Sequence, residues 1–243
     1  MLTFLRSLLF SIGMLVTILG YGALVPLVAL APFPRRYAFT RHWARTNLRW
    51  LELTCGVHYR VVGRDNLPKR PAVVLSKHQS TWETLAFQEI LPPLVWVMKR
   101  ELLWLPFFGW GLALGRPIAI DRKAGRRAME QMLSQGKQRL ADGLWVVIFP
   151  EGTRMPPGQR GRYRPGGALL AVQAQVPVVP IAHNAGELWG KRRFLKYPGT
   201  ITVAIGPPIE TTGRDPAAVL KQAEDWIENT ISGMIPPARS TPR

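Results

Sequence analysis

The sequence predicts an α/β fold: a mixed, largely buried β-sheet flanked by helices, with an N-terminal hydrophobic and amphipathic helical membrane anchor. Residues 7–34 contain no charged side chain, and residues 36–53 combine a helical repeat with recurring arginines. From residue 57 on, short apolar runs alternate with helical segments, and several of these runs are continuously apolar. Strands covered on both faces have this pattern, and strand–helix alternation is typical of a layered α/β domain.

Composition indicates the class of partner. Lys and Arg outnumber Asp and Glu by 32 to 15, a formal charge of +17, which points to nucleic acid or to an anionic membrane surface. Because 47% of the residues are hydrophobic and nine are Trp, we expect anionic membrane lipids as partners and no nucleic acid. The single cysteine, Cys55, permits no intramolecular disulfide. No His or Cys pair has the spacing of a metal site, so no metal is expected.

The apolar run from about residue 8 to residue 30 is long enough, as a helix, to cross a hydrocarbon layer of about 30 Å. It either spans the membrane or dips into one leaflet and returns. In the second case Gly20, Gly22 and Pro26 would break the helix. A cleaved signal peptide is a third interpretation, because residues 29–31 (ALA) resemble a cleavage site, although the run is longer than such peptides usually have.

Residues 36–53 have the pattern of an amphipathic helix. The aromatic residues share one side of a 3.6-residue repeat: Phe39, Trp43 and Trp50. The arginines recur every fourth residue on another side: Arg41, Arg45 and Arg49. This pattern predicts a helix at the membrane surface, with arginines at the headgroups and tryptophans at the acyl boundary. The alternative is a helix whose aromatic face packs on the core. Residues 1–55 are therefore assigned to membrane-anchoring helices.

The remaining chain is predicted as one α/β domain, residues 56–235, and a flexible tail, residues 236–243, rich in proline and basic residues. Seven apolar runs are predicted as strands: Val57–Val62, Ala72–Ser76, Leu94–Met98, Ile118–Asp121, Leu144–Phe149, Val178–Ala182 and Ile201–Ile205. Four segments are predicted as helices: Thr81–Ile90, Lys123–Leu140, Gly167–Gln175 and Pro216–Ile231.

A histidine and a carboxylate follow the second predicted strand, in residues 76–83 (SKHQSTWE). On one continuous helix, a spacing of five residues would place His78 and Glu83 about 140° apart. Residues 80–83 form a capping box, which starts the helix at Ser80 and leaves His78 in the preceding loop. Glu83 can then hold one ring nitrogen while the other acts as a base. An ordinary loop histidine beside a helix cap is the alternative.

A second polar segment, residues 149–154 (FPEGTR), follows the fifth predicted strand. The carboxyl end of a buried strand is where α/β proteins place ligands. Arg154 offers a planar set of donors that suits a phosphate, and Gly152 permits a tight turn. The alternative is a solvated turn with a surface ion pair between Glu151 and Arg154.

These two segments resemble the first and third sequence blocks of the glycerolipid acyltransferase family, whose bacterial members include the 1-acyl-sn-glycerol-3-phosphate acyltransferases. Residues 115–122 (GRPIAIDR) resemble the second block and residues 176–181 (VPVVPI) the fourth. The four blocks occur in the family's order and cover about residues 70–185. The family usually ends its first block in aspartate, where this chain has Glu83. Met155 stands where a serine is common.

The resemblance implies transfer of a fatty acyl group from acyl-CoA or acyl-acyl-carrier protein to the sn-2 hydroxyl of 1-acyl-sn-glycerol 3-phosphate. The product, phosphatidic acid, would serve phospholipid biosynthesis. The resemblance also implies that His78 takes the hydroxyl proton while Glu83 orients the imidazole. No covalent acyl-enzyme forms in such a reaction, and no cofactor is needed beyond the acyl donor as co-substrate.

The same resemblance assigns the acceptor's phosphate to two arginines, Arg122 and Arg154. Lys99, just past a predicted strand end, is expected to be a third cation. Three residues of the second polar segment are expected to shape or line the same pocket: Glu151, Gly152 and Thr153.

Because acyl donors are made in the cytosol, the catalytic domain is expected to face the cytoplasm from the bacterial inner membrane. Two alternative functions stay open. One is a related acyltransferase with another acceptor, such as glycerol 3-phosphate or a lyso-aminolipid. The other is a non-catalytic basic protein that binds membranes.

Overall fold

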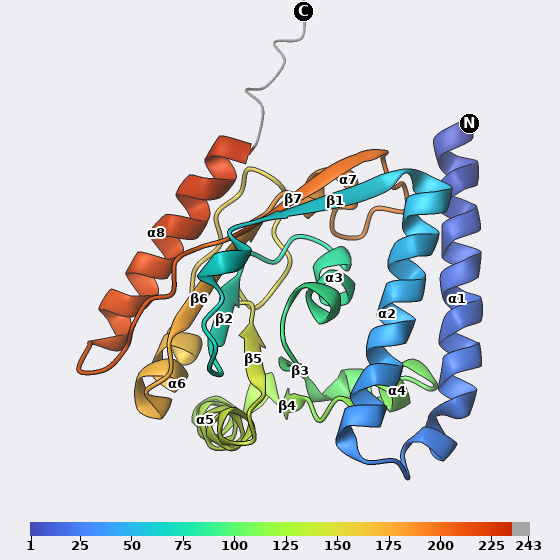
Figure 1. Ribbon diagram of the computed structural model, residues 1–243. Coiled ribbons are helices and arrows are strands. Elements are labelled where there is room, and N and C mark those ends of the chain that lie inside the picture. The colour runs from blue at the N-terminus through green and yellow to red at the C-terminus, as the bar shows by residue number, and fades with distance from the viewer. Residues whose placement is uncertain (235–243) are drawn as a thin grey trace, which may run out of the picture.

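Seven strands form one sheet at the centre of this computed structural model, which describes residues 1–234 except the side chain of Arg122 (Figure 1). The strands are β1 (Val57–Val62), β2 (Val73–Ser76), β3 (Leu94–Lys99), β4 (Ile118–Ile120), β5 (Trp145–Ile148), β6 (Val178–His183) and β7 (Gly199–Ile205). Their order in the sheet is β1-β7-β6-β2-β5-β3-β4. Every neighbouring pair is parallel except β6 and β7, so the predicted mixed sheet is confirmed. The predicted tail, residues 236–243, lies outside the described residues.

The predicted strands are all present, and their ends differ from the prediction by no more than two residues. The helices are α1 (Leu2–Val28), α2 (Phe33–Cys55), α3 (Trp82–Ile90), α4 (Phe108–Leu114), α5 (Arg126–Ala141), α6 (Gly166–Ala174), α7 (Ala185–Leu188) and α8 (Pro216–Met234). Three short 3-10 turns accompany them: η1 (Arg64–Asn66), η2 (Arg100–Trp104) and η3 (Arg122–Ala124). The four helices predicted after the anchor correspond to α3, α5, α6 and α8, whereas α4 and α7 were not predicted.

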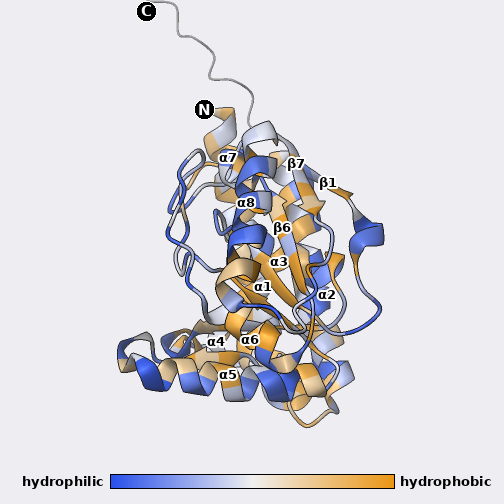
Figure 2. Ribbon diagram, turned by 90° about the vertical axis from the view of Figure 1, so that its left-hand side faces the viewer, coloured by the Kyte–Doolittle hydropathy of each residue, from blue (hydrophilic) through white to orange (hydrophobic). Residues whose placement is uncertain are grey.

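The sheet has a separate hydrophobic core on each face. Along β2, Val74 joins the core shared with α2 and α3, whereas Val73 and Leu75 join the core shared with α5, α6 and α8. Because successive side chains of a strand point to opposite faces, an apolar run such as this one is buried on both sides. Figure 2 shows the apolar strands behind α8, whose outer surface is hydrophilic.

The first two helices form an antiparallel hairpin that belongs to the same core as the sheet (Figure 1). Phe10 of α1 and Leu51 of α2 are 1% and 0% exposed within that core. α1 runs without interruption through Gly20, Gly22 and Pro26, so the predicted break at these residues is wrong. Pro26 lies in the last turn, where the loss of one backbone donor does not end a helix.

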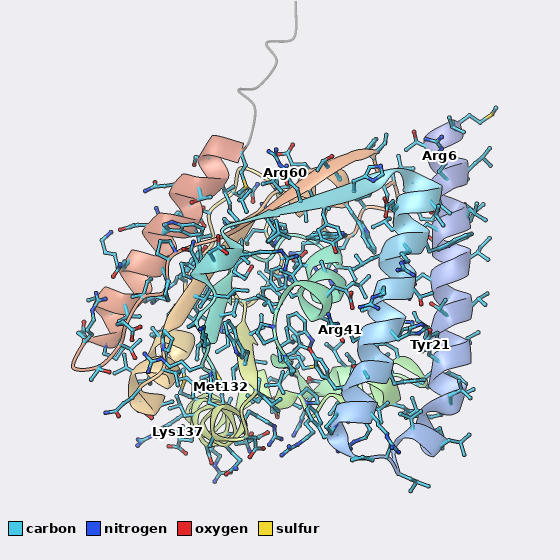
Figure 3. The ribbon with its side chains drawn as sticks, in the orientation of Figure 1. Arg6, Tyr21, Arg41, Arg60, Met132 and Lys137 are labelled. Atoms are coloured by element: carbon cyan, nitrogen blue, oxygen red, sulfur yellow. The ribbon has the colours of Figure 1, made fainter. Side chains whose placement is uncertain are left out.

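The membrane arrangement predicted for α2 is also wrong. Its aromatic face packs on α1, because the indole N–H groups of Trp43 and Trp50 donate hydrogen bonds to that helix. Arg41 and Arg45 both pair with Glu89 of α3, at 2.9 and 2.8 Å. In Figure 3 the side chain of Arg41 lies between α2 and α3, and Tyr21 lies between α1 and α2. The local repeat could not distinguish an acyl chain from a neighbouring apolar helix.

The surface suited to a membrane belongs to α1. In the described chain it is the one helix that is long and apolar enough to cross a membrane. Its outward face carries a series of exposed apolar side chains, including Leu5, Ile12 and Leu19 at 52%, 53% and 44% exposure. Of the two segments predicted to contact the membrane, α1 therefore keeps a surface suited to it and α2 does not.

Candidate active site

The predicted site residues gather where four parallel strands end. β4, β3, β5 and β2 are successive neighbours in the sheet and run in one direction, so their carboxyl ends share one edge. His78 follows β2, residues 149–154 follow β5, Lys99 ends β3 and Arg122 begins η3 after β4. The side chain of Arg122 lies outside the described part of the structure.

A single oxygen of Glu83 organises the histidine loop. Glu83 is fully buried, and its Oε1 accepts hydrogen bonds from Nδ1–H of His78 at 2.8 Å and from the backbone N–H groups of Gln79 and Ser80, both at 2.9 Å. The hydroxyl of Ser80 accepts from the N–H of Trp82 at 3.1 Å. The helix itself begins at Trp82, one residue later than in the predicted range Thr81–Ile90. Glu83 therefore acts as a helix cap and as the partner of the histidine at once.

The imidazole of His78 lies between the ring of Phe149 and the cavity. Its ring stacks on Phe149, with centroids 4.0 Å apart and an interplanar angle of 13°. Because Nδ1 donates to Glu83, the other nitrogen, Nε2, presents its lone pair. Among the described residues Nε2 has no hydrogen-bond partner, and the side chain, 16% exposed, lines a cavity. This is the geometry of a general base that is open to a substrate.

The charge of Glu83 is set by opposing effects. Burial alone would raise the pKa of Glu83, but the imidazoles of His183 and His78 and the N–H of Ser80 hold it below its ordinary value. Burial lowers the pKa of His183, whose Nε2–H donates to the carbonyl oxygen of Lys77 at 2.9 Å. An ionised Glu83 stabilises the imidazolium that forms when His78 accepts a proton.

Glu151 lies beneath the cavity rather than at its wall. Its Oε2 accepts a hydrogen bond from the backbone N–H of His78 at 3.2 Å, and its Oε1 lies 2.8 Å from Nζ of Lys77. Lys77, only 1% exposed, also pairs with Glu228 of α8 at 2.8 Å. Burial raises the pKa of Glu151, while the nearby Lys77 acts in the opposite direction.

Two predictions are corrected here. The surface ion pair between Glu151 and Arg154, given as an alternative, does not form, and Glu151 instead pairs with Lys77, which is buried between two carboxylates. Glu151 therefore positions the histidine loop and does not line the pocket where the phosphate was predicted. The available signal was the place of Lys77 directly after β2, every residue of which is buried.

The cavity above these residues measures about 620 Å³ and reaches α1 and α2, where Met14 and Trp43 line it. The structure brings five of the predicted site residues to its wall: His78, Lys99, Gly152, Thr153 and Arg154. Three cations that the prediction omitted also line it: Arg164, Lys191 and Arg192. No carboxylate belongs to the described lining. Within residues 1–234, no three His, Cys, Asp or Glu side chains gather in a way that could hold a metal ion.

Residues 58–184 match the family described as Acyltransferase. The 1-acyl-sn-glycerol-3-phosphate acyltransferase of Pseudomonas aeruginosa is 45% identical over 237 residues, which cover 96% of this chain and 92% of that protein. The 1-acyl-sn-glycerol-3-phosphate acyltransferase alpha of Mus musculus is 38% identical over 165 residues, 66% of this chain and 58% of that protein.

The fold has a solved counterpart. The crystal structure of the 1-acyl-sn-glycerophosphate (LPA) acyltransferase PlsC from Thermotoga maritima superposes with a TM-score of 0.78. The match covers 98% of this chain and 97% of that one. Since the two sequences are 23% identical, this likeness shows the fold alone.

Proposed function

The chain belongs to the acyltransferase family, and we propose that it acylates the sn-2 hydroxyl of 1-acyl-sn-glycerol 3-phosphate to form phosphatidic acid. The donor would be acyl-CoA or acyl-acyl-carrier protein, with no further cofactor. One observation carries the proposal. The free nitrogen of a carboxylate-held imidazole faces a cavity with apolar and cationic walls and no described carboxylate. Such a cavity suits a lipid with an anionic headgroup.

The proposed reaction follows from the geometry of His78 and Glu83. Nε2 of His78 removes the proton from the acceptor hydroxyl, and the oxygen attacks the carbonyl carbon of the donor thioester. The carbon–sulfur bond then breaks, and the departing thiolate receives the proton from the imidazolium. Glu83 stabilises that imidazolium through Nδ1. A positioned base of this kind contributes roughly 10²–10⁴-fold to the rate.

The acceptor's phosphate is assigned to Arg154 and Lys99, with Arg122 contributed by η3. The first two lie on the cavity wall at the ends of neighbouring strands, β5 and β3. The planar guanidinium of Arg154 suits two phosphate oxygens at once. Because the sn-2 hydroxyl is only a few bonds from the phosphate, gripping the phosphate also positions the hydroxyl near the base.

The exposed face of α1 supports a place on the bacterial inner membrane, with the cytosolic donor entering from the cytoplasmic side. α2 packs antiparallel along α1 and carries charged residues, among them Arg41 and Arg45 bound to α3. A spanning α1 would draw these charges into hydrocarbon, at a cost of several kcal/mol. We therefore place α1 in one leaflet, with α2 between it and the sheet.

The activity is tested by incubating the full chain, in detergent or vesicles, with labelled acyl-CoA or acyl-acyl-carrier protein and 1-acyl-sn-glycerol 3-phosphate. We expect labelled phosphatidic acid. Arg154→Ala should raise the KM for this acceptor by about tenfold or more, because a charge-assisted phosphate contact is lost. A monoacylglycerol, which lacks the phosphate, should be a poor acceptor whose turnover the change leaves alone.

The matched control is Arg162→Ala, an exposed arginine eight residues away that does not line the cavity. It should leave both acceptors unaffected. Absence of phosphatidic acid with either donor, or equal losses on both acceptors in Arg154→Ala, would contradict the proposal.

A further inference from the structure

The cavity holds more positive charge than one acceptor phosphate requires. Five cationic side chains line it: Lys99, Arg154, Arg164, Lys191 and Arg192. In the described chain none of them forms an ion pair with a carboxylate, although many other arginines and lysines do. Closely spaced unpaired cations repel one another, and anionic ligands relieve that repulsion. A phosphomonoester carries at most about two negative charges, so one acceptor phosphate does not neutralise all five cations.

Two of these cations lie against one turn of the loop after β5, and a third, Arg192, follows one of them in the chain and also lines the cavity. Nζ of Lys191 donates to the hydroxyl of Thr153 at 3.3 Å. The guanidinium of Arg164 lies over Gly152, because a Cβ added there would stand 3.5 Å from Nε of Arg164. Arg192 lies next to Lys191, in the left-handed backbone region with φ 57°. Non-glycine residues occupy this region at a cost in energy, so the surrounding structure holds Arg192 in place.

Two of these cations, Lys191 and Arg192, come from a different connection than Lys99, whereas Arg164 lies in the loop after β5. Lys191 and Arg192 lie in the connection between β6 and β7, whereas Lys99 ends β3 and Arg122 follows β4. In the sheet order β6-β2-β5-β3-β4, the strands before His78 and the FPEGTR segment stand between them. The cavity thus gathers cations from several connections of the sheet, more than one phosphate requires.

We propose that Arg164, Lys191 and Arg192 form a second anion site, which binds the phosphate of the donor's 4′-phosphopantetheine arm. This inference rests on the proposed function, in which a thioester donor and a phospholipid acceptor occupy the cavity together. Both are anionic, and the donor's phosphate is separated from its thioester by the whole pantetheine arm. CoA and acyl carrier protein share that arm, so the site serves either donor by the same chemistry.

The test measures equilibrium binding to the full chain of three acyl-free probes: CoA, 4′-phosphopantetheine and pantetheine. 4′-Phosphopantetheine should bind at least about tenfold more tightly than pantetheine, because only the former offers a phosphate to charge-assisted hydrogen bonds. Arg164→Gln, Lys191→Gln and Arg192→Gln should each reduce that advantage, and the triple change should abolish it. If CoA binds more tightly than 4′-phosphopantetheine and the same changes remove that difference, the site is specific to CoA. If the two probes bind equally, the site recognises the arm that both donors share.

Two exposed neighbours serve as matched controls, Arg162→Gln and Arg193→Gln, since neither side chain lines the cavity. They should bind all three probes as the parent does. Binding of 1-acyl-sn-glycerol 3-phosphate should survive the triple change. The site is refuted if pantetheine binds as tightly as 4′-phosphopantetheine, or if the triple change weakens the lipid and not the phosphate probes. Because these are binding measurements, a parent that makes no phosphatidic acid would refute the proposed function separately.

Discussion

At the scale of the residue, one oxygen atom of Glu83 holds both the loop before α3 and the imidazole of His78. The loop before α3 is held by its bonds to the N–H groups of Gln79 and Ser80, and the imidazole of His78 is held by the same atom. The other oxygen, Oε2, is buried and has no hydrogen-bond partner among the described residues. All three hydrogen bonds that Glu83 accepts therefore go to Oε1, the oxygen that holds the imidazole of His78.

Glu83→Gln should separate the two tasks. The amide oxygen can still accept the three N–H bonds, so the loop and the thermal stability should change little. The negative charge that stabilises the imidazolium is lost, so kcat should fall by roughly 10²-fold or more. Steady-state kinetics and a melting curve measure the two effects.

Two further changes control that experiment. Glu83→Asp keeps the charge and should retain more activity than Glu83→Gln. His78→Ala should be at least as inactive as Glu83→Gln, with the double change little worse, because the two residues act as a unit. Near-normal turnover in Glu83→Gln would leave Glu83 as a helix cap only.

At the scale of the element, the hairpin of α1 and α2 divides two tasks between its helices. α2 joins the domain through its aromatic face and through the pairs of Arg41 and Arg45 with Glu89. α1 buries one face on α2 and leaves a mostly apolar face exposed, with Arg6 as the one charged side chain of this helix. We therefore expect changes on the two helices to affect different properties.

Replacing Leu5, Ile12 and Leu19 with glutamine should weaken vesicle binding by about a hundredfold or more. Each apolar side chain contributes about 1.5–3 kcal/mol when fully buried, and all three face outward. A flotation assay with neutral and with anionic vesicles measures the effect, which should appear with both. Folding should persist, because none of the three lies in the core.

Arg41→Gln with Arg45→Gln is the matched comparison. These changes should lower the melting temperature, because Glu89 is left largely buried without its partners. They should not alter vesicle binding. Loss of binding to anionic vesicles alone would restore the arrangement predicted from the sequence, with these arginines at the headgroups.

The repeat patterns predicted the elements well and their partners poorly. A continuously apolar run is sufficient evidence for a strand buried on both faces, so β2, β5 and β6 could be located within one residue at each end. The partner of an arginine is different: Glu89 lies 48 residues from Arg41, and no local pattern reports it. The burial of Lys77 could not be predicted for the same reason, because its partner Glu228 is 151 residues away. The short, glycine-rich α4 gives no amphipathic repeat.

At the scale of the whole molecule, a buried charge network ties α8 to the site. Lys77 lies between Glu151 of the loop after β5 and Glu228 of α8, and it also donates to the carbonyl oxygen of Gln159 at 2.9 Å. Tyr163 adds a hydroxyl hydrogen bond to Glu228 at 2.8 Å. Segments far apart in the chain therefore meet directly behind the backbone of His78.

Lys77→Met should destabilise the fold by about 3–5 kcal/mol, because it leaves the buried Glu151 and the partly buried Glu228 without their cation. Adding Glu228→Gln should recover part of the loss. Lys221→Met, an exposed lysine of α8, should stay within about 0.5 kcal/mol of the parent. Denaturant unfolding in detergent measures all three, and a loss in Lys77→Met no larger than in Lys221→Met would show that the network contributes little.

The pairing of β1 with β7 has a consequence for synthesis. Arg60 and Thr202 are hydrogen-bonded across these strands although 142 residues separate them (Arg60 is labelled in Figure 3). The hairpin and β1 are synthesised before the rest of the sheet, and β1 has no neighbour in the sheet until β7 has followed. Contacts between such distant segments form slowly. Until β7 is made, the exposed apolar side chains of α1 would face water. We therefore expect that the bilayer proposed for the folded protein also binds the nascent chain while it folds.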